Sequence, residues 1–118
     1  MAIHDLIEQL RAHPETSRIG MIASHLGVVR GHSLDGRPVR EIDVVYDADK
    51  VVSIANDTKM LNGIIDVLVE IHEGVLHVGE EILAVAVAGE TRDAVFPALI
   101  RTVDRIKAEA VRKREVTP

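Results

Sequence analysis

The chain has 118 residues, of which 47% are hydrophobic, and this length and composition are typical of one compact domain with its own core. It contains no cysteine, which excludes disulfides, thiolate catalysis and cysteine-ligated metals, so we expect a cytoplasmic protein. A net charge of −5 and an aromatic content of 2% argue against nucleic-acid binding, and the apolar runs are too short to span a membrane.

The first half of the chain predicts one helix and two strands. Apolar residues at helical spacing and the stop at Pro14 predict an amphipathic helix over residues 2–12. Residues 18–26 and 39–46 each have the pattern of a strand, and turn-forming residues fill the loop at 31–38. We expect these two strands to pair antiparallel across that loop.

The second half predicts two helices and two strands. Helical spacing recurs over residues 50–62, and residues 64–71 read as a strand that leads into a glycine-punctuated connection at 72–81. Residues 82–88 form an apolar run between Gly79 and Gly89, which is typical of a well-buried strand. Thr91 or Glu90 could begin the long helix that follows.

An apolar stripe on this helix continues to Ala110, and we expect residues 112–118 to be a loosely held tail. The predicted order is α-β-β-α-β-β-α. The fold class is α+β, with an antiparallel sheet packed by helices in a single domain over residues 1–118.

The six histidines show none of the short spacings that are typical of a zinc site, so no metal site is predicted. The glycines do not form a phosphate-binding loop of the Walker or Rossmann kind and read as turns.

Several ordered motifs resemble one known family. They are Ser24-His25-Leu26-Gly27-Val28-Val29-Arg30, Tyr46-Asp47-Ala48, Ile71-His72 with Gly79-Glu80, Asp104-Arg105-Ile106-Lys107 and Lys113-Arg114-Glu115. In this order they resemble the catalytic (large) subunit family of molybdopterin synthase, the MoaE-like family. The resemblance covers roughly residues 18–115, and at the first motif the family has Ser-Phe-x-Gly-x-Val-Arg.

The resemblance implies an α/β hammerhead fold and a sulfur transfer in molybdenum cofactor biosynthesis. Sulfur would pass from the thiocarboxylated C-terminus of a small ubiquitin-like (MoaD-like) partner to cyclic pyranopterin monophosphate. The family forms homodimers whose pockets take residues from both subunits, and no cofactor is implied. Carried over residue by residue, Lys107 and Lys113 are the catalytic candidates, and the substrate-binding candidates are Arg30, Thr91, Arg92, Arg114 and Glu115.

Three departures from the family support an alternative. Thr91 replaces the histidine of a His-Arg corner, Glu73 replaces an arginine after His72, and the chain ends at Pro118 where the family continues. The alternative is a non-catalytic homologue that keeps the fold, the dimer and the docking of the partner. In such a protein the cations of the former site would point apart or pair with Glu73, Glu90 or Glu115. Cations such as Lys107 near the end of a helix also have a purely structural explanation, since they interact favourably with the helix dipole.

Overall fold

Strand β5 (Glu81–Gly89) is the centre of the fold. The computed structural model, which describes residues 2–118, places it between β1 (Met21–Val28) and β3 (Ile64–Ile71) in an antiparallel sheet of order β1-β5-β3. Its residues from Leu83 to Gly89 are all buried. The sequence prediction of a well-buried strand at 82–88 is therefore confirmed.

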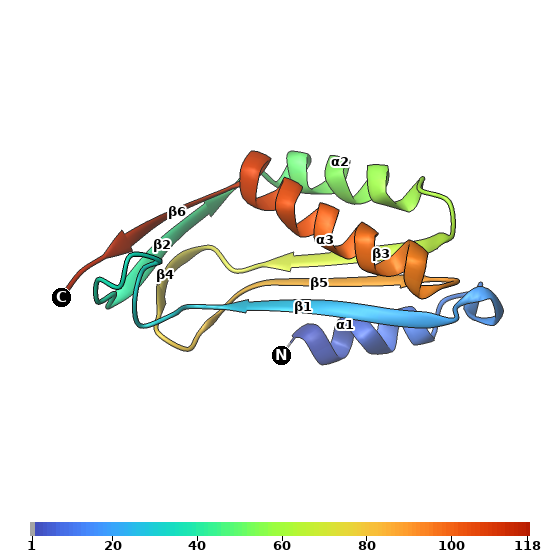
Figure 1. Ribbon diagram of the computed structural model, residues 1–118, viewed down its shortest axis with the longest axis horizontal. Coiled ribbons are helices and arrows are strands. Elements are labelled where there is room, and N and C mark those ends of the chain that lie inside the picture. Colours follow the sequence, from blue (N-terminus) through green and yellow to red (C-terminus); the bar gives the residue numbers. More distant parts are fainter. Residues whose placement is uncertain (1) are drawn as a thin grey trace.

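The two faces of β5 carry residues of different size. Leu83, Val85 and Val87 pack towards α2 (Ala48–Lys59) and α3 (Arg92–Glu109), whereas Ala84, Ala86 and Ala88 pack against α1 (Ala2–Arg11). Figure 1 shows the resulting layers, with α2 and α3 on one face of the sheet and α1 on the other. A hydroxyl–hydroxyl hydrogen bond of 2.7 Å between Thr58 and Thr102 joins α2 to α3 inside the core.

A second antiparallel sheet extends the molecule at one end. It has the order β4-β2-β6, made of β4 (Gly74–His77), β2 (Glu41–Tyr46) and β6 (Val111–Val116). Val29, Val39, Ile42, Val44 and Leu76 form its core. The two sheets lie end to end, which gives the molecule its elongated shape of 50 × 24 × 23 Å (Figure 1).

The predicted pairing of the first two strands is wrong. β1 pairs with β5, and β2 pairs with β4 and β6 in the other sheet. The chain from Val29 to Arg40 crosses from one sheet to the other instead of closing a hairpin. The physical reason is the apolar character of β5, which needs a neighbour on each side and takes β1 and β3.

Two strands were not predicted. β4 is only four residues long and lies in the segment that we read as a connection, and β6 occupies the predicted loose tail. The sequence of β6 is Val-Arg-Lys-Arg-Glu-Val, and its four charged residues do not give the pattern of a strand. It forms a strand nevertheless, because pairing with the edge of β2 requires only its backbone. Charged edge strands of this kind protect a sheet against further pairing.

The helices differ from their predicted bounds by a few residues. Arg18, predicted to open the first strand, instead ends a short 3₁₀ helix (Thr16–Arg18). α2 begins at Ala48 with Asp47 as its cap, and α3 begins at Arg92 with Thr91 as its cap, which resolves the choice between Thr91 and Glu90. Within residues 2–118, no helix is both long and apolar enough to cross a membrane.

The close approach of β5 to the start of α3 is testable at Gly89. A Cβ atom at this position would lie 2.6 Å from both the Gly63 carbonyl oxygen and Val95 Cγ2. We expect Gly89→Ala to lower the free energy of unfolding by about 1–3 kcal/mol, because backbone atoms must move to make room. Chemical denaturation measures the change.

Gly31→Ala is the matched control, because its Cβ would meet nothing closer than Val78 Cγ1 at 3.9 Å. We expect it to change the unfolding free energy by less than about 0.5 kcal/mol. Equal effects of the two substitutions would contradict the packing described here.

Candidate functional site

A cavity of about 440 Å³ lies where the two sheets meet. Its wall is made by the end of β1 and the loop after it, the start of β5, the last turn of α3 and the start of β6. Five apolar residues form one part of the lining, namely Val28, Leu34, Ile82, Leu83 and Val111. Gly27 and four residues with nitrogen-bearing side chains form the rest, the four being His25, Arg30, Lys107 and Lys113.

Three of the predicted site residues therefore come together at this cavity, each carried by a different element. Lys107 lies in the last turn of α3, whose end is tied to α2 by a hydrogen bond from the Asp47 N–H to the Ala110 carbonyl. Lys113 lies on β6, opposite Val44 of β2. Arg30 follows Val29, whose backbone bonds in both directions to the turn at Gly79 and Glu80.

The three cations are uncompensated. Among residues 2–118, neither Arg30 nor Lys107 nor Lys113 forms an ion pair or a side-chain hydrogen bond, and no carboxylate lines the cavity. Like charges gathered without counter-ions create a positive potential, which favours an anionic ligand even in a protein that is acidic overall. The apolar part of the lining suits a flat ring system.

Arg114 and Glu115 do not line the cavity. Side chains alternate along a strand, so Val111 and Lys113 face the cavity while Arg114 points to the opposite side of β6. There its guanidinium lies 3.9 Å from the carboxylate of Asp43, its cross-strand neighbour. Glu115, beside Ile42 in the register, is further along β6.

Thr91 and Arg92 lie at the other end of α3. The Thr91 hydroxyl accepts a hydrogen bond of 3.3 Å from the Ala94 N–H, so this side chain caps the helix. Arg92 is exposed, and Lys107 is fifteen residues later, which corresponds to about 22 Å along the axis. Within one chain, Arg92 and the cavity cannot contact the same small ligand.

The acidic residues that would pair with the cations of a non-catalytic homologue do not neutralise the site. Glu90 forms an ion pair of 2.7 Å with Arg18. Within the described part of the chain, neither Glu73 nor Glu115 forms an ion pair with any cation.

His25 is a cavity residue that our sequence analysis did not select, because we considered the histidines only as metal ligands. Burial and the nearby charge of Lys107 lower the pKa of its imidazole below the usual 6.5. The sequence feature that could have identified His25 was its place in the motif that ends at Arg30. The described residues contain no cluster of three or more potential metal-ligating side chains.

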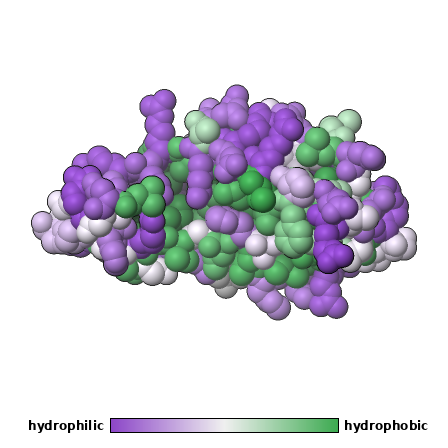
Figure 2. Space-filling model, viewed as in Figure 1, coloured by the Kyte–Doolittle hydropathy of each residue, from purple (hydrophilic) through white to green (hydrophobic). Residues whose placement is uncertain are grey.

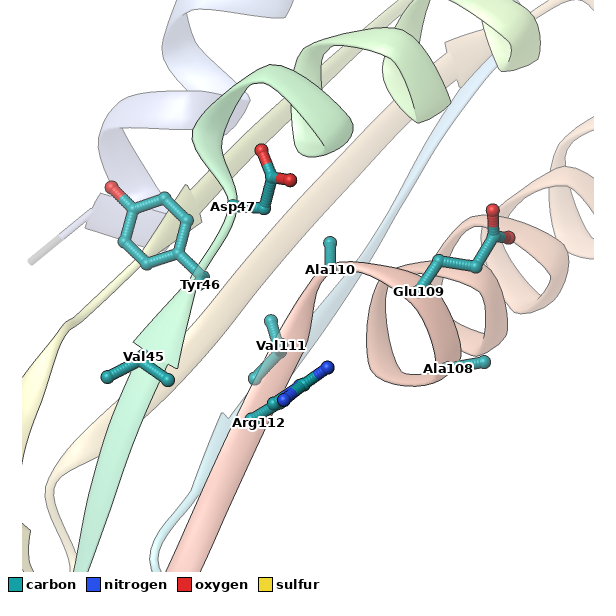
Figure 3. A pocket seen from close by; sticks show the side chains of 8 residues that line it. All are labelled: Val45, Tyr46, Asp47, Ala108, Glu109, Ala110, Val111 and Arg112. Carbon is teal, nitrogen blue, oxygen red and sulfur yellow. The ribbon is translucent and has the colours of Figure 1, made fainter.

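A second hollow, of about 390 Å³, lies nearby, but its two carboxylates serve the fold. It is lined by residues 45–47 at the end of β2 and residues 108–112 between α3 and β6 (Figure 3). Asp47 caps α2 through the Lys50 N–H, and Glu109 pairs with Arg105 at 2.8 Å and with Lys50 at 3.5 Å. The first cavity is therefore the candidate site.

Comparisons with known proteins agree with one another. Residues 2–109 match the family described as "MoaE protein". The chain is 34% identical over 118 residues to the molybdopterin synthase catalytic subunit of Pyrococcus abyssi, and this match covers 94% of the chain and 78% of that protein.

Two solved structures are similar in fold. The molybdopterin biosynthesis MoaE protein of Burkholderia ambifaria superposes with a TM-score of 0.80 at 26% identity, covering 100% of this chain and 78% of the other. The complex of subunits 1 and 2 of molybdopterin-converting factor from Helicobacter pylori contains a chain with a TM-score of 0.75 at 12% identity, covering 99% and 80%. The family match, the curated relative and the shared α+β fold together show that this chain belongs to the MoaE family.

Proposed function

We propose that this protein is the catalytic subunit of a molybdopterin synthase and acts in molybdenum cofactor biosynthesis. It transfers sulfur from the thiocarboxylated C-terminus of a small ubiquitin-like partner to cyclic pyranopterin monophosphate, which becomes the molybdopterin dithiolene. The observation that carries this proposal is the cavity with three unpaired cations and an apolar wall in a member of the MoaE family.

The lining residues have the chemistry that this reaction needs. Arg30 can hold a phosphate through two parallel hydrogen bonds. Lys107, in the last turn of α3, can donate a proton to the oxygen that leaves the pterin or hold an acyl group. Lys113 faces the same cavity from β6 and is the second catalytic candidate.

A partner supplies the sulfur in this proposal. The fold relative from Helicobacter pylori was solved as a complex of two subunits of molybdopterin-converting factor. We propose that a small sulfur-carrier subunit docks here too, with its extended C-terminal tail entering the cavity. A tail of this kind can be held through its backbone.

The alternative of a non-catalytic homologue predicts that the cations of the site point apart or pair with acidic residues. The described residues contain no such ion pairs, and Glu90 is engaged with Arg18 instead. This observation favours the enzyme.

We further propose a homodimer that completes the site. At about 100° per residue, Arg92, Phe96, Ile100 and Lys107 fall on one side of α3. This side is opposite to the one that meets α2 through Thr102 and Arg105.

Two apolar residues of this side are left exposed: Phe96 is 50% exposed and Ile100 is 61% exposed. Figure 2 shows hydrophobic side chains among hydrophilic ones on this face of the molecule, over α3 and β1. β1 is also an edge strand of its sheet. A two-fold axis near Ile100 would pack two α3 helices antiparallel and bring Arg92 of one subunit to Lys107 of the other.

The first test is Lys107→Ala. We expect synthase activity to fall by at least about 100-fold, because a proton donor is lost, while the unfolding free energy changes by only a few tenths of a kcal/mol, about the contribution of an exposed helix-end cation. The assay follows dithiolene formation from the pyranopterin with a thiocarboxylated carrier. Arg101→Ala, an exposed cation on the same helix that does not line the cavity, is the control and should be fully active. Normal turnover by Lys107→Ala would refute the assigned role.

The second test is complementation between two inactive variants. If each site takes Lys107 from one subunit and Arg92 from the other, co-expressed Arg92→Ala and Lys107→Ala chains form mixed dimers with one intact site. Random pairing predicts about a quarter of wild-type activity, from two nearly inactive parents. A purely monomeric protein at micromolar concentration, or a mixture no more active than its parents, would contradict the shared site.

A further inference from the structure

The Nε2 atom of His25 is buried and has no hydrogen-bond partner in the protein. Among residues 2–118, it is the only buried side-chain nitrogen or oxygen in this condition. The ring as a whole is half-buried and lines the cavity together with Lys107. A buried polar atom that makes no hydrogen bond costs free energy, so folding alone does not account for a nitrogen here.

The backbone around His25 leaves room for the ring. A Cβ atom at Gly27 would lie 3.4 Å from His25 Nε2, which places the nitrogen above the backbone of Gly27. His25 lies opposite Val85 and Gly27 lies opposite Leu83, so both are cross-strand neighbours of β5, which contributes Ile82 and Leu83 to the apolar wall. A phenylalanine ring would fill the same space. Compared with phenylalanine, the imidazole nitrogen adds only the ability to form a hydrogen bond and to take up a proton.

The titratable groups that face the ring are all cationic. Lys107 comes from α3, Lys113 from β6 and Arg30 from the loop after β1, and β5 contributes only Ile82 and Leu83. No carboxylate lines the cavity to stabilise an imidazolium.

We propose that His25 is a ligand-binding residue of this cavity, neutral in the free protein and protonated when a phosphorylated ligand is bound. The class of ligand rests on the proposed function, whereas the binding role of His25 rests on the geometry.

The proton balance follows from the surrounding charges. In the free protein, burial and the charge of Lys107 hold the pKa of His25 below 6.5. A phosphate in the cavity offsets the charge of the cations and offers an oxygen that can accept a hydrogen bond from the imidazolium ring, so it raises the pKa. Binding then takes up a proton in the pH range between the two pKa values, and affinity increases as the pH falls through that range.

Sulfate is the probe for the test, because it keeps its double charge over the whole pH range of the experiment. The imidazole signals of the intact protein are followed by NMR from pH 5 to 8, with and without sulfate at constant ionic strength. We expect the pKa of His25 to lie below the usual 6.5 without sulfate and to shift upward when sulfate is added. A shift of about one unit corresponds to about tenfold tighter sulfate binding at the acidic end.

Two variants separate binding from packing. His25→Phe keeps the aromatic ring and should bind sulfate as the wild type does near pH 8, but should lose the increase in affinity at low pH. His32→Gln is the control and should keep that increase, because His32 does not line the cavity.

The inference is overturned if sulfate does not move the titration of His25, or if His25→Phe keeps the pH dependence of the wild type. These two measurements decide the binding role of His25 without any assay of synthase activity. A His25 that responds to sulfate in a protein without synthase activity would refute the proposed function and leave the binding role intact.

Discussion

The whole structure depends on burying both faces of β5. The segment from Ile82 to Ala88 has no polar side chain, so water must be excluded from each side of the strand. The small alanines on one face pack against the single helix α1. On the other face, the larger Leu83, Val85 and Val87 pack against α2 and α3. This arrangement places α3 over the sheet and carries its last turn, with Lys107, to the end where β5 begins.

The second sheet brings the remaining cations to that end. β6 follows α3 after Ala110 and pairs with β2, and the Asp47–Ala110 backbone bond ties the ends of β2 and α3 together. Lys113 is thereby held against the first sheet, and the crossing segment at Val29 brings Arg30 to the same place. The cavity exists only where the two sheets meet, so its electrostatics are a property of the tertiary fold. Its positive charge persists in an acidic protein because Glu109, the carboxylate in the last turn of α3, is engaged with Arg105 and Lys50.

Apolar periodicity was sufficient to predict the three helices and the buried strand, since burial leaves a direct trace in the residue pattern. It could not predict β6, whose charged side chains need no core, nor the pairing of β1 with β5, which depends on long-range competition among strands. The prediction that Lys107 and Lys113 belong to one site came from the motif resemblance. Their separation in the sequence alone does not give the distance between a residue on a helix and a residue on the strand that follows it. His25 was missed because nothing in a lone histidine reveals that its nitrogen will be buried without a partner.

Thr91 and His25 differ in the interactions that remain open to each side chain. Thr91 stands where the resemblance places a histidine, but its hydroxyl is committed to the Ala94 N–H and lies at the far end of α3 from Lys107. Of the described histidines, only His25 lines the cavity, and it stands where the resemblance places a phenylalanine. An imidazole on β1 is held by the same chain as Lys107, whereas an imidazole at position 91 would reach that lysine only across a dimer. If the proposed dimer forms, protonation of His25 depends on one subunit and substrate binding on two, so disrupting that dimer would weaken binding more than it changes the titration of His25.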